Sequence, residues 1–62
     1  MTDEQAKIVV ALRQSNAALT QGELAERTKL STRDVRENCY ALKAQGYVNY
    51  NGGNYSLTRA RR

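Results

Sequence analysis

Arginine and lysine side chains are the groups of this chain best suited to bind a partner, and they are spread unevenly along it. Residues 27–62 hold eight basic and two acidic residues, whereas residues 1–26 hold two basic and four acidic ones. Guanidinium and ammonium groups bind phosphate oxygens, and a guanidinium also forks onto the O6 and N7 atoms of guanine. The second half of the chain therefore predicts a polyanionic partner, with a merely solvated basic surface as the alternative. Its basic residues are Arg27, Lys29, Arg33, Arg36, Lys43, Arg59, Arg61 and Arg62.

A long amphipathic helix over residues 32–45 is expected to carry the central group of these side chains. Val35, Cys39 and Leu42 recur at i, i+4 and i+7, which is the spacing of one buried helical face. The residues that would face outward, opposite this stripe, are Thr32, Arg33, Arg36, Glu37, Tyr40 and Lys43.

The ends of this helix are marked by Ser31 and Gly46. Ser31 and Asp34 have the S-x-x-D spacing of a capping box, in which the Ser31 oxygen takes the Asp34 amide and the carboxylate returns a bond to the cap amide. We therefore assign Asp34 to the cap rather than to a ligand. Gly46 is typical of the left-handed residue that ends a helix. The free amides near Ser31 and Thr32 suit a phosphate, with capping alone as the alternative for Ser31.

A shorter helix over residues 21–28 is predicted just before the long one. Thr20 and Glu23 form a T-x-x-E capping box at its start. Residues 28–31 carry no helical stripe of their own and predict a tight turn. A short helix, a tight turn and a longer helix with a polar face make a helix-turn-helix.

The N-terminal segment predicts another helix and a short strand. Thr2 and Gln5 form a capping box at the start of the helix, and polar residues 15–16 end it. Val10 lies off the apolar face of this helix, which indicates either partial burial or a protein-contact patch. Residues 17–19 are apolar and predict a small strand.

A hairpin is expected to follow the long helix. Residues 47–50 and 55–58 favour strands through their aromatic and β-branched content, and residues 51–54, Asn-Gly-Gly-Asn, form a turn that tolerates positive φ. A two-stranded hairpin is marginal alone, so we expect it to pack back on the helices.

Several classes of function find no support in the composition. The 62 residues fit one domain, and they contain no histidine and a single cysteine, Cys39, so we expect no metal, no cofactor and no enzyme activity. No apolar run approaches the ~20 residues of a membrane span, and acidic residues stand where a signal peptide would carry basic ones. We expect a cytoplasmic protein without a small-molecule substrate.

The ordered motifs between residues 21 and 58 resemble the winged helix-turn-helix DNA-binding domains of bacterial and phage regulators. The resemblance implies an α+β fold with three helices and a small antiparallel sheet with a two-stranded wing, in the order α-β-α-α-β-β. The domain would cover residues 1–58, with a basic tail at 59–62. The matching segments are Glu23-Leu24-Ala25, Leu30-Ser31, the stripe Val35, Cys39 and Leu42, Gly46-Tyr47-Val48 and Tyr55-Ser56-Leu57-Thr58.

The same resemblance implies roles for the outward residues. The base-edge contacts would come from Thr32, Arg33, Arg36 and Glu37, with Tyr40 and Lys43 nearer the phosphates and Gln21 at a backbone phosphate. The alternative for Glu37 is an i,i+4 pair with Arg33.

The predicted wing departs from the family pattern, because its tip is short and uncharged. Asn51 and Asn54 would contact DNA or simply form the turn. The tail residues Arg59 and Arg61 would supply charge near the wing, with a solvated terminus as the alternative.

From these features we expect a sequence-specific regulator of transcription that places helix 32–45 in the major groove of double-stranded DNA. Specificity from so small a module would need a homodimer, a tandem site or a protein partner. The alternative is a protein-interaction module or adaptor that uses the same scaffold to modulate a larger DNA-bound protein or enzyme.

Overall fold

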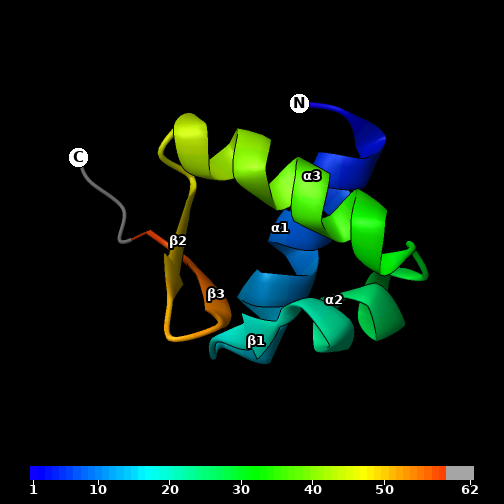
Figure 1. Ribbon diagram of the computed structural model, residues 1–62, viewed down its shortest axis with the longest axis horizontal. Helices are drawn as coiled ribbons and strands as arrows, with labels where there is room; N and C mark the ends of the chain where they lie inside the picture. Colours follow the sequence, from blue (N-terminus) through cyan, green and yellow to red (C-terminus); the bar gives the residue numbers. More distant parts are fainter. Residues whose placement is uncertain (59–62) are drawn as a thin grey trace.

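The computed structural model describes residues 1–58, which form three helices and a three-stranded antiparallel sheet (Figure 1). This confirms the prediction of a small α+β domain with this order of elements along the chain. The elements are α1 (Asp3–Ser15), β1 (Leu19–Thr20), α2 (Gln21–Thr28), α3 (Thr32–Ala44), β2 (Val48–Asn51) and β3 (Asn54–Leu57).

The sheet has the order β1-β3-β2, so its strand order differs from the order along the chain. β3 is the central strand, and it pairs antiparallel with both neighbours. Tyr55 on β3 stands opposite Leu19 of β1 on one side and Tyr50 of β2 on the other. Because β1 precedes α2 directly, this pairing ties the start of α2 to the hairpin.

The β2–β3 hairpin turns through two glycines. Gly52 and Gly53 have φ values of +61° and +86°, and both lie in the left-handed region that a type I′ turn requires. Asn51 and Asn54 pair with each other at the ends of the strands, so the expected four-residue turn is present as the two glycines and their flanking asparagines.

The helix ends follow the local chemistry of the sequence. Thr2 and Thr20 each accept a bond from the amide three residues on, and Gln5 and Glu23 return the bond, so both capping boxes are complete. At the end of α3, Gly46 has φ +86°, and the amides of Gly46 and Tyr47 donate to Lys43 and Leu42. These two bonds form a Schellman motif, which satisfies carbonyls that the helix end leaves free.

A single hydrophobic core lies between the three helices and the sheet. Ile8, Leu24, Val35, Cys39 and Leu42 are fully buried in it. The predicted apolar stripe of the long helix is therefore confirmed. The other members of the core are Val9, Ala11, Leu12, Leu19, Val48 and Tyr55, with Ala25, Leu30 and Leu57 packed at its edge.

The predicted element ends differ from the structure by one or two residues. α3 ends at Ala44, with Gln45 as its cap residue. The first strand is Leu19–Thr20 rather than residues 17–19, because the strand bonds reach only as far as the residues opposite Asn54 and Tyr55. Fraying and weak edge pairing make such ends hard to place from sequence.

Candidate nucleic-acid interface

α3 separates an apolar face from a polar one, as the stripe spacing requires. The buried face holds Val35, Cys39 and Leu42. The opposite face is open to solvent, and Tyr40 there is 76% exposed. Every residue expected to face outward is exposed: Thr32, Arg33, Arg36, Glu37, Tyr40 and Lys43.

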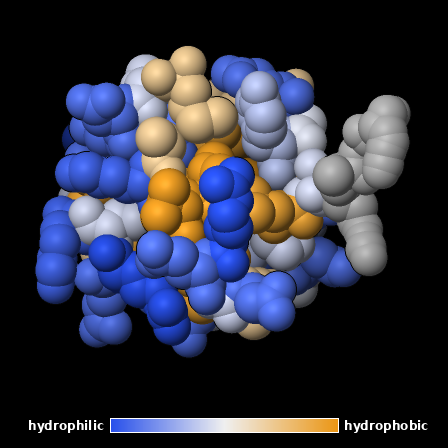
Figure 2. Space-filling model, turned by 180° about the vertical axis from the view of Figure 1, so that it is seen from behind, coloured by the Kyte–Doolittle hydropathy of each residue, from blue (hydrophilic) through white to orange (hydrophobic). Residues whose placement is uncertain are grey.

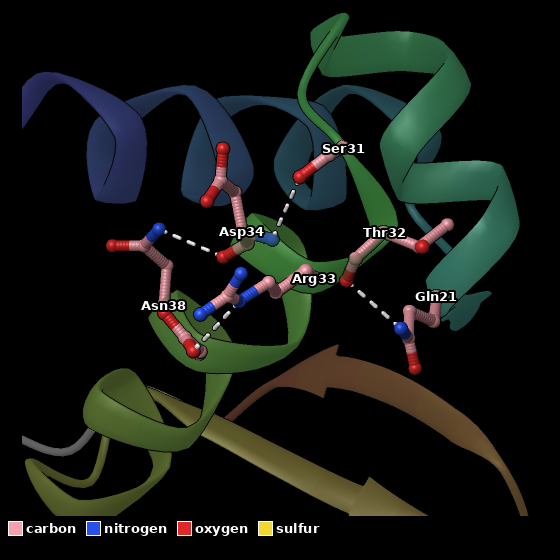
Figure 3. A network of polar contacts seen from close by, with 7 residues as sticks. Gln21, Ser31, Thr32, Arg33, Asp34 and Asn38 are labelled. Atoms are coloured by element: carbon pink, nitrogen blue, oxygen red, sulfur yellow. Dashed lines mark hydrogen bonds and ion pairs between the residues drawn. The ribbon is translucent and has the colours of Figure 1, made fainter.

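The start of α3 is fixed by bonds from two directions (Figure 3). The Ser31 hydroxyl accepts the Asp34 amide at 3.0 Å, and the Gln21 side chain donates from Nε2 to the Thr32 carbonyl at 2.8 Å. Gln21 is the first residue of α2, so its side chain joins the starts of the two helices. The amides of Thr32 and Arg33 have no partner within the helix, because a helix leaves its first amides unpaired.

The capping box predicted for Ser31 and Asp34 is only half formed, so the predicted bond to the Asp34 carboxylate is wrong. Among the described residues, the hydrogen bonds at this cap include the one that Ser31 accepts but none from the Ser31 amide to the Asp34 carboxylate. A capping box uses Glu or Gln at this position, and the Asp side chain is one methylene shorter. The backbone carbonyl of Asp34, a different group from the carboxylate, accepts the Asn38 side-chain amide at 2.8 Å. Asp34 still lies in the first turn, where its charge suits the helix dipole.

Arg33 and Glu37 form the i,i+4 pair that was the alternative for Glu37. The Arg33 Nε atom lies 3.5 Å from a Glu37 carboxylate oxygen, and the two side chains are 78% and 60% exposed. A pair this long and this solvated adds little to stability. Both side chains can therefore be redirected to a ligand at small cost, although Glu37 reduces the positive potential around Arg33.

Arg36 lies on the flank of α3 that approaches the hairpin. Its positive charge lowers the pKa of Tyr55 slightly, against a larger rise caused by burial of the Tyr55 ring. The Tyr55 ring packs against Tyr50, with centroids 4.8 Å apart and planes tilted by 49°. This cross-strand pair joins β2 to β3 next to the turn and stabilises the hairpin.

The hairpin tip carries no charge. Asn51 is exposed, and Asn54 is half-buried. The Asn54 side-chain amide donates to the Gly52 carbonyl at 3.5 Å, a long bond that agrees with a turn-forming role. The predicted contributions of Arg59 and Arg61 fall outside the described residues.

Residues 1–58 contain no group of three His, Cys, Asp or Glu side chains that could hold a metal ion. The Cys39 thiol is fully buried, and burial raises its pKa to about 11, so it is neutral near pH 7 and a poor nucleophile. In the same part of the chain, no helix has the length and apolar character needed to cross a membrane.

The sequence predicts the polar face of α3 but not the hydrogen bond that holds the start of α3 to α2. The phosphate contact of Gln21 stays a prediction, and the structure adds that the Gln21 side chain joins α2 to α3. A bond between residues eleven apart leaves no periodic signal. No protein-family model and no curated protein matches the chain.

Proposed function

We propose that the chain is a winged helix-turn-helix protein that binds double-stranded DNA and regulates transcription, with α3 in the major groove and the β2–β3 hairpin as the wing. The observation that carries the proposal is the Gln21–Thr32 bond, because it brings the start of α2 to the start of α3, where Arg33 lies (Figure 3). Each helix start leaves free backbone amides, and in this proposal they would bind phosphates beside the basic residues of α3.

The dimensions of α3 agree with this role. Its 13 residues span roughly 20 Å at 1.5 Å per residue, and a major groove admits an α-helix. Arg33 and Arg36 lie in the first half of α3, where they would read guanine edges, together with Thr32 and Glu37. Tyr40 and Lys43 lie one to two turns further on and would meet the backbone.

The wing supplies shape rather than charge in this proposal. Its glycine tip brings the backbone of Gly52 and Gly53 close to a minor groove without a side chain in the way. Asn51 and Asn54 would offer amide groups, and the tail arginines would add phosphate contacts. The function requires no cofactor and places the protein in the cytoplasm, where bacterial and phage DNA is read.

One module of this size reads few base pairs. Useful specificity then requires a homodimer on paired half-sites, a tandem site or a companion protein. The salt dependence of duplex binding measures the phosphate part of the interaction independently of the target sequence.

The test is a titration of ¹⁵N-labelled protein with a random-sequence duplex at several salt concentrations, followed by NMR shifts. Three to five phosphate contacts predict a slope of roughly −3 to −4.5 for log K against log salt concentration. The expected shifts cluster on residues 31–43 and at Gln21. A lack of binding at low salt, or shifts centred on α1, would contradict the proposal.

A further inference from the structure

A groove between α1 and α2 is a surface feature that the DNA proposal does not use. Its volume is about 580 Å³. The apolar floor comes from small side chains of α1 and from Val10. The lining residues are Ala6, Lys7, Val10, Ala11, Gln14, Arg27 and Thr28.

Val10 is the apolar anchor of this groove. It is 43% exposed, although Ile8 and Leu12 on the other side of α1 are buried. Ala6 and Ala11 beside it are small enough to let another backbone approach. The aliphatic stems of Lys7 and Arg27 extend the apolar surface while their charged ends stay in water. Figure 2 shows apolar surface gathered at the centre of the back of the molecule, bordered by hydrophilic side chains.

The two charged side chains that line the groove are both basic, whereas the acidic residues of α1 and α2 do not line it. Lys7 and Arg27 are the charged residues that line it. Within residues 1–58 the ion pair that forms is Arg33–Glu37, so neither Lys7 nor Arg27 forms an ion pair with a carboxylate there. A second copy docked groove to groove would bring four basic groups together. The charge pattern therefore favours an acidic occupant over self-association.

We propose that this groove binds an acidic amphipathic helix of a partner protein. An apolar side chain of that helix would cover Val10, and its carboxylates would face Lys7 and Arg27. This is the helix-in-groove mode of recognition, in which apolar anchors supply affinity and flanking charges supply selectivity.

The position of the groove allows a partner and DNA to bind together. α1 lies behind α3 in the view of Figure 1, and the groove is lined by residues of α1 and α2 alone. None of the exposed residues of α3 belongs to this lining. A helix in the groove would thus leave Arg33 and Arg36 free, and it would supply the companion that a single small module needs.

The test uses two designed helical peptides of about 14 residues, each ~21 Å long when helical. One carries leucines at i, i+3 and i+7 flanked by glutamates, and the other has lysines in place of the glutamates. NMR titrations at ~0.15 M salt would follow the amides of the full chain. The expected result is saturable shifts from the acidic peptide at residues 6–14 and at Arg27 and Thr28, with the basic peptide at least ~10-fold weaker.

Variants make the test specific. Val10→Asp should abolish the shifts, and Val10→Ser serves the same purpose if the aspartate disturbs folding. Lys7→Glu combined with Arg27→Glu should reverse the preference toward the basic peptide. Unchanged α3 resonances would establish that each variant folds. Equal binding of both peptides, shifts outside the groove, or concentration-dependent shifts at the groove without peptide would overturn the proposal.

Discussion

Gln21 and Thr32 join the starts of α2 and α3 through a hydrogen bond of 2.8 Å from the Gln21 side chain to the Thr32 carbonyl. The bond spans the whole of α2 and the turn after it. Lys29 within that turn adopts φ +66°, a left-handed conformation that is uncommon for a residue with a side chain. The angle between the two helices is therefore held at both ends: by the Lys29 turn and by the Gln21 side chain.

Replacing Gln21 should loosen this angle without unfolding the domain. For Gln21→Ala we expect a loss of about 0.5–1.5 kcal/mol in the free energy of unfolding, the usual value of one hydrogen bond. We also expect weaker duplex binding. Urea unfolding and duplex titration measure the two effects. Gln14→Ala is the matched control, because Gln14 is an exposed glutamine on α1. Equal effects of the two substitutions would contradict a linking role for Gln21.

Arg36 is expected to contribute sequence preference as well as charge. For Arg36→Ala we predict a loss of roughly 1–3 kcal/mol in discrimination at one base pair of the selected site, because the guanidinium fork is removed. Arg36→Lys keeps the charge and lacks the fork, so it should retain non-specific affinity and lose preference. Selection of sites from a random pool compares the variants, with Arg13→Ala on α1 as the control. Unchanged preference in Arg36→Ala would rule out the readout role.

The sequence predicted the parts of this fold that depend on neighbours along the chain. Thr2 and Thr20 each have a Gln or Glu three residues on, and both capping boxes form. Val35, Cys39 and Leu42 have helical spacing, and all three are buried. Such signals are local, because caps and stripes are decided within one or two turns of helix.

The features that the sequence did not predict depend on the length of a side chain or on contacts between residues far apart in the chain. Asp34 matched the capping pattern by type, but the return bond expected from its carboxylate is not among the hydrogen bonds of the described cap. The link from Gln21 to Thr32 and the groove beside Val10 arise only when α1, α2 and α3 pack together. The nomination of base-reading residues rests on the resemblance, and in the structure those residues are exposed on α3.

The cap of α3 should depend on Ser31 for its side-chain hydrogen bond, whereas the Asp34 side chain contributes its charge. Ser31→Ala removes the acceptor for the Asp34 amide, and we expect a loss of about 1 kcal/mol in the free energy of unfolding. Asp34→Asn removes only a charge near the helix start and should cost a few tenths to about 1 kcal/mol.

The complete cap of α2 provides the comparison. Glu23 accepts the Thr20 amide at 2.8 Å, so Glu23→Ala should cost more than Asp34→Ala. Chemical denaturation of the four variants gives the ranking. A larger loss in Asp34→Ala than in Glu23→Ala would indicate that Asp34 supports the cap after all.

Cys39 should make the stability of the fold sensitive to alkaline pH. Burial raises the pKa of its thiol from 9.0 to about 11, so the folded state disfavours the thiolate relative to the unfolded state. The stabilisation associated with the neutral thiol is fully present below pH 9, and it is lost as the pH rises from about 9 toward 11. Urea unfolding of the wild type and of Cys39→Ala across this range isolates the effect, because Tyr55 titrates in both proteins. As the pH rises, the free energy of unfolding of the wild type should fall relative to that of Cys39→Ala. A difference that stays constant from pH 8 to pH 11 would mean that the thiol ionises as easily in the folded chain as in the unfolded one.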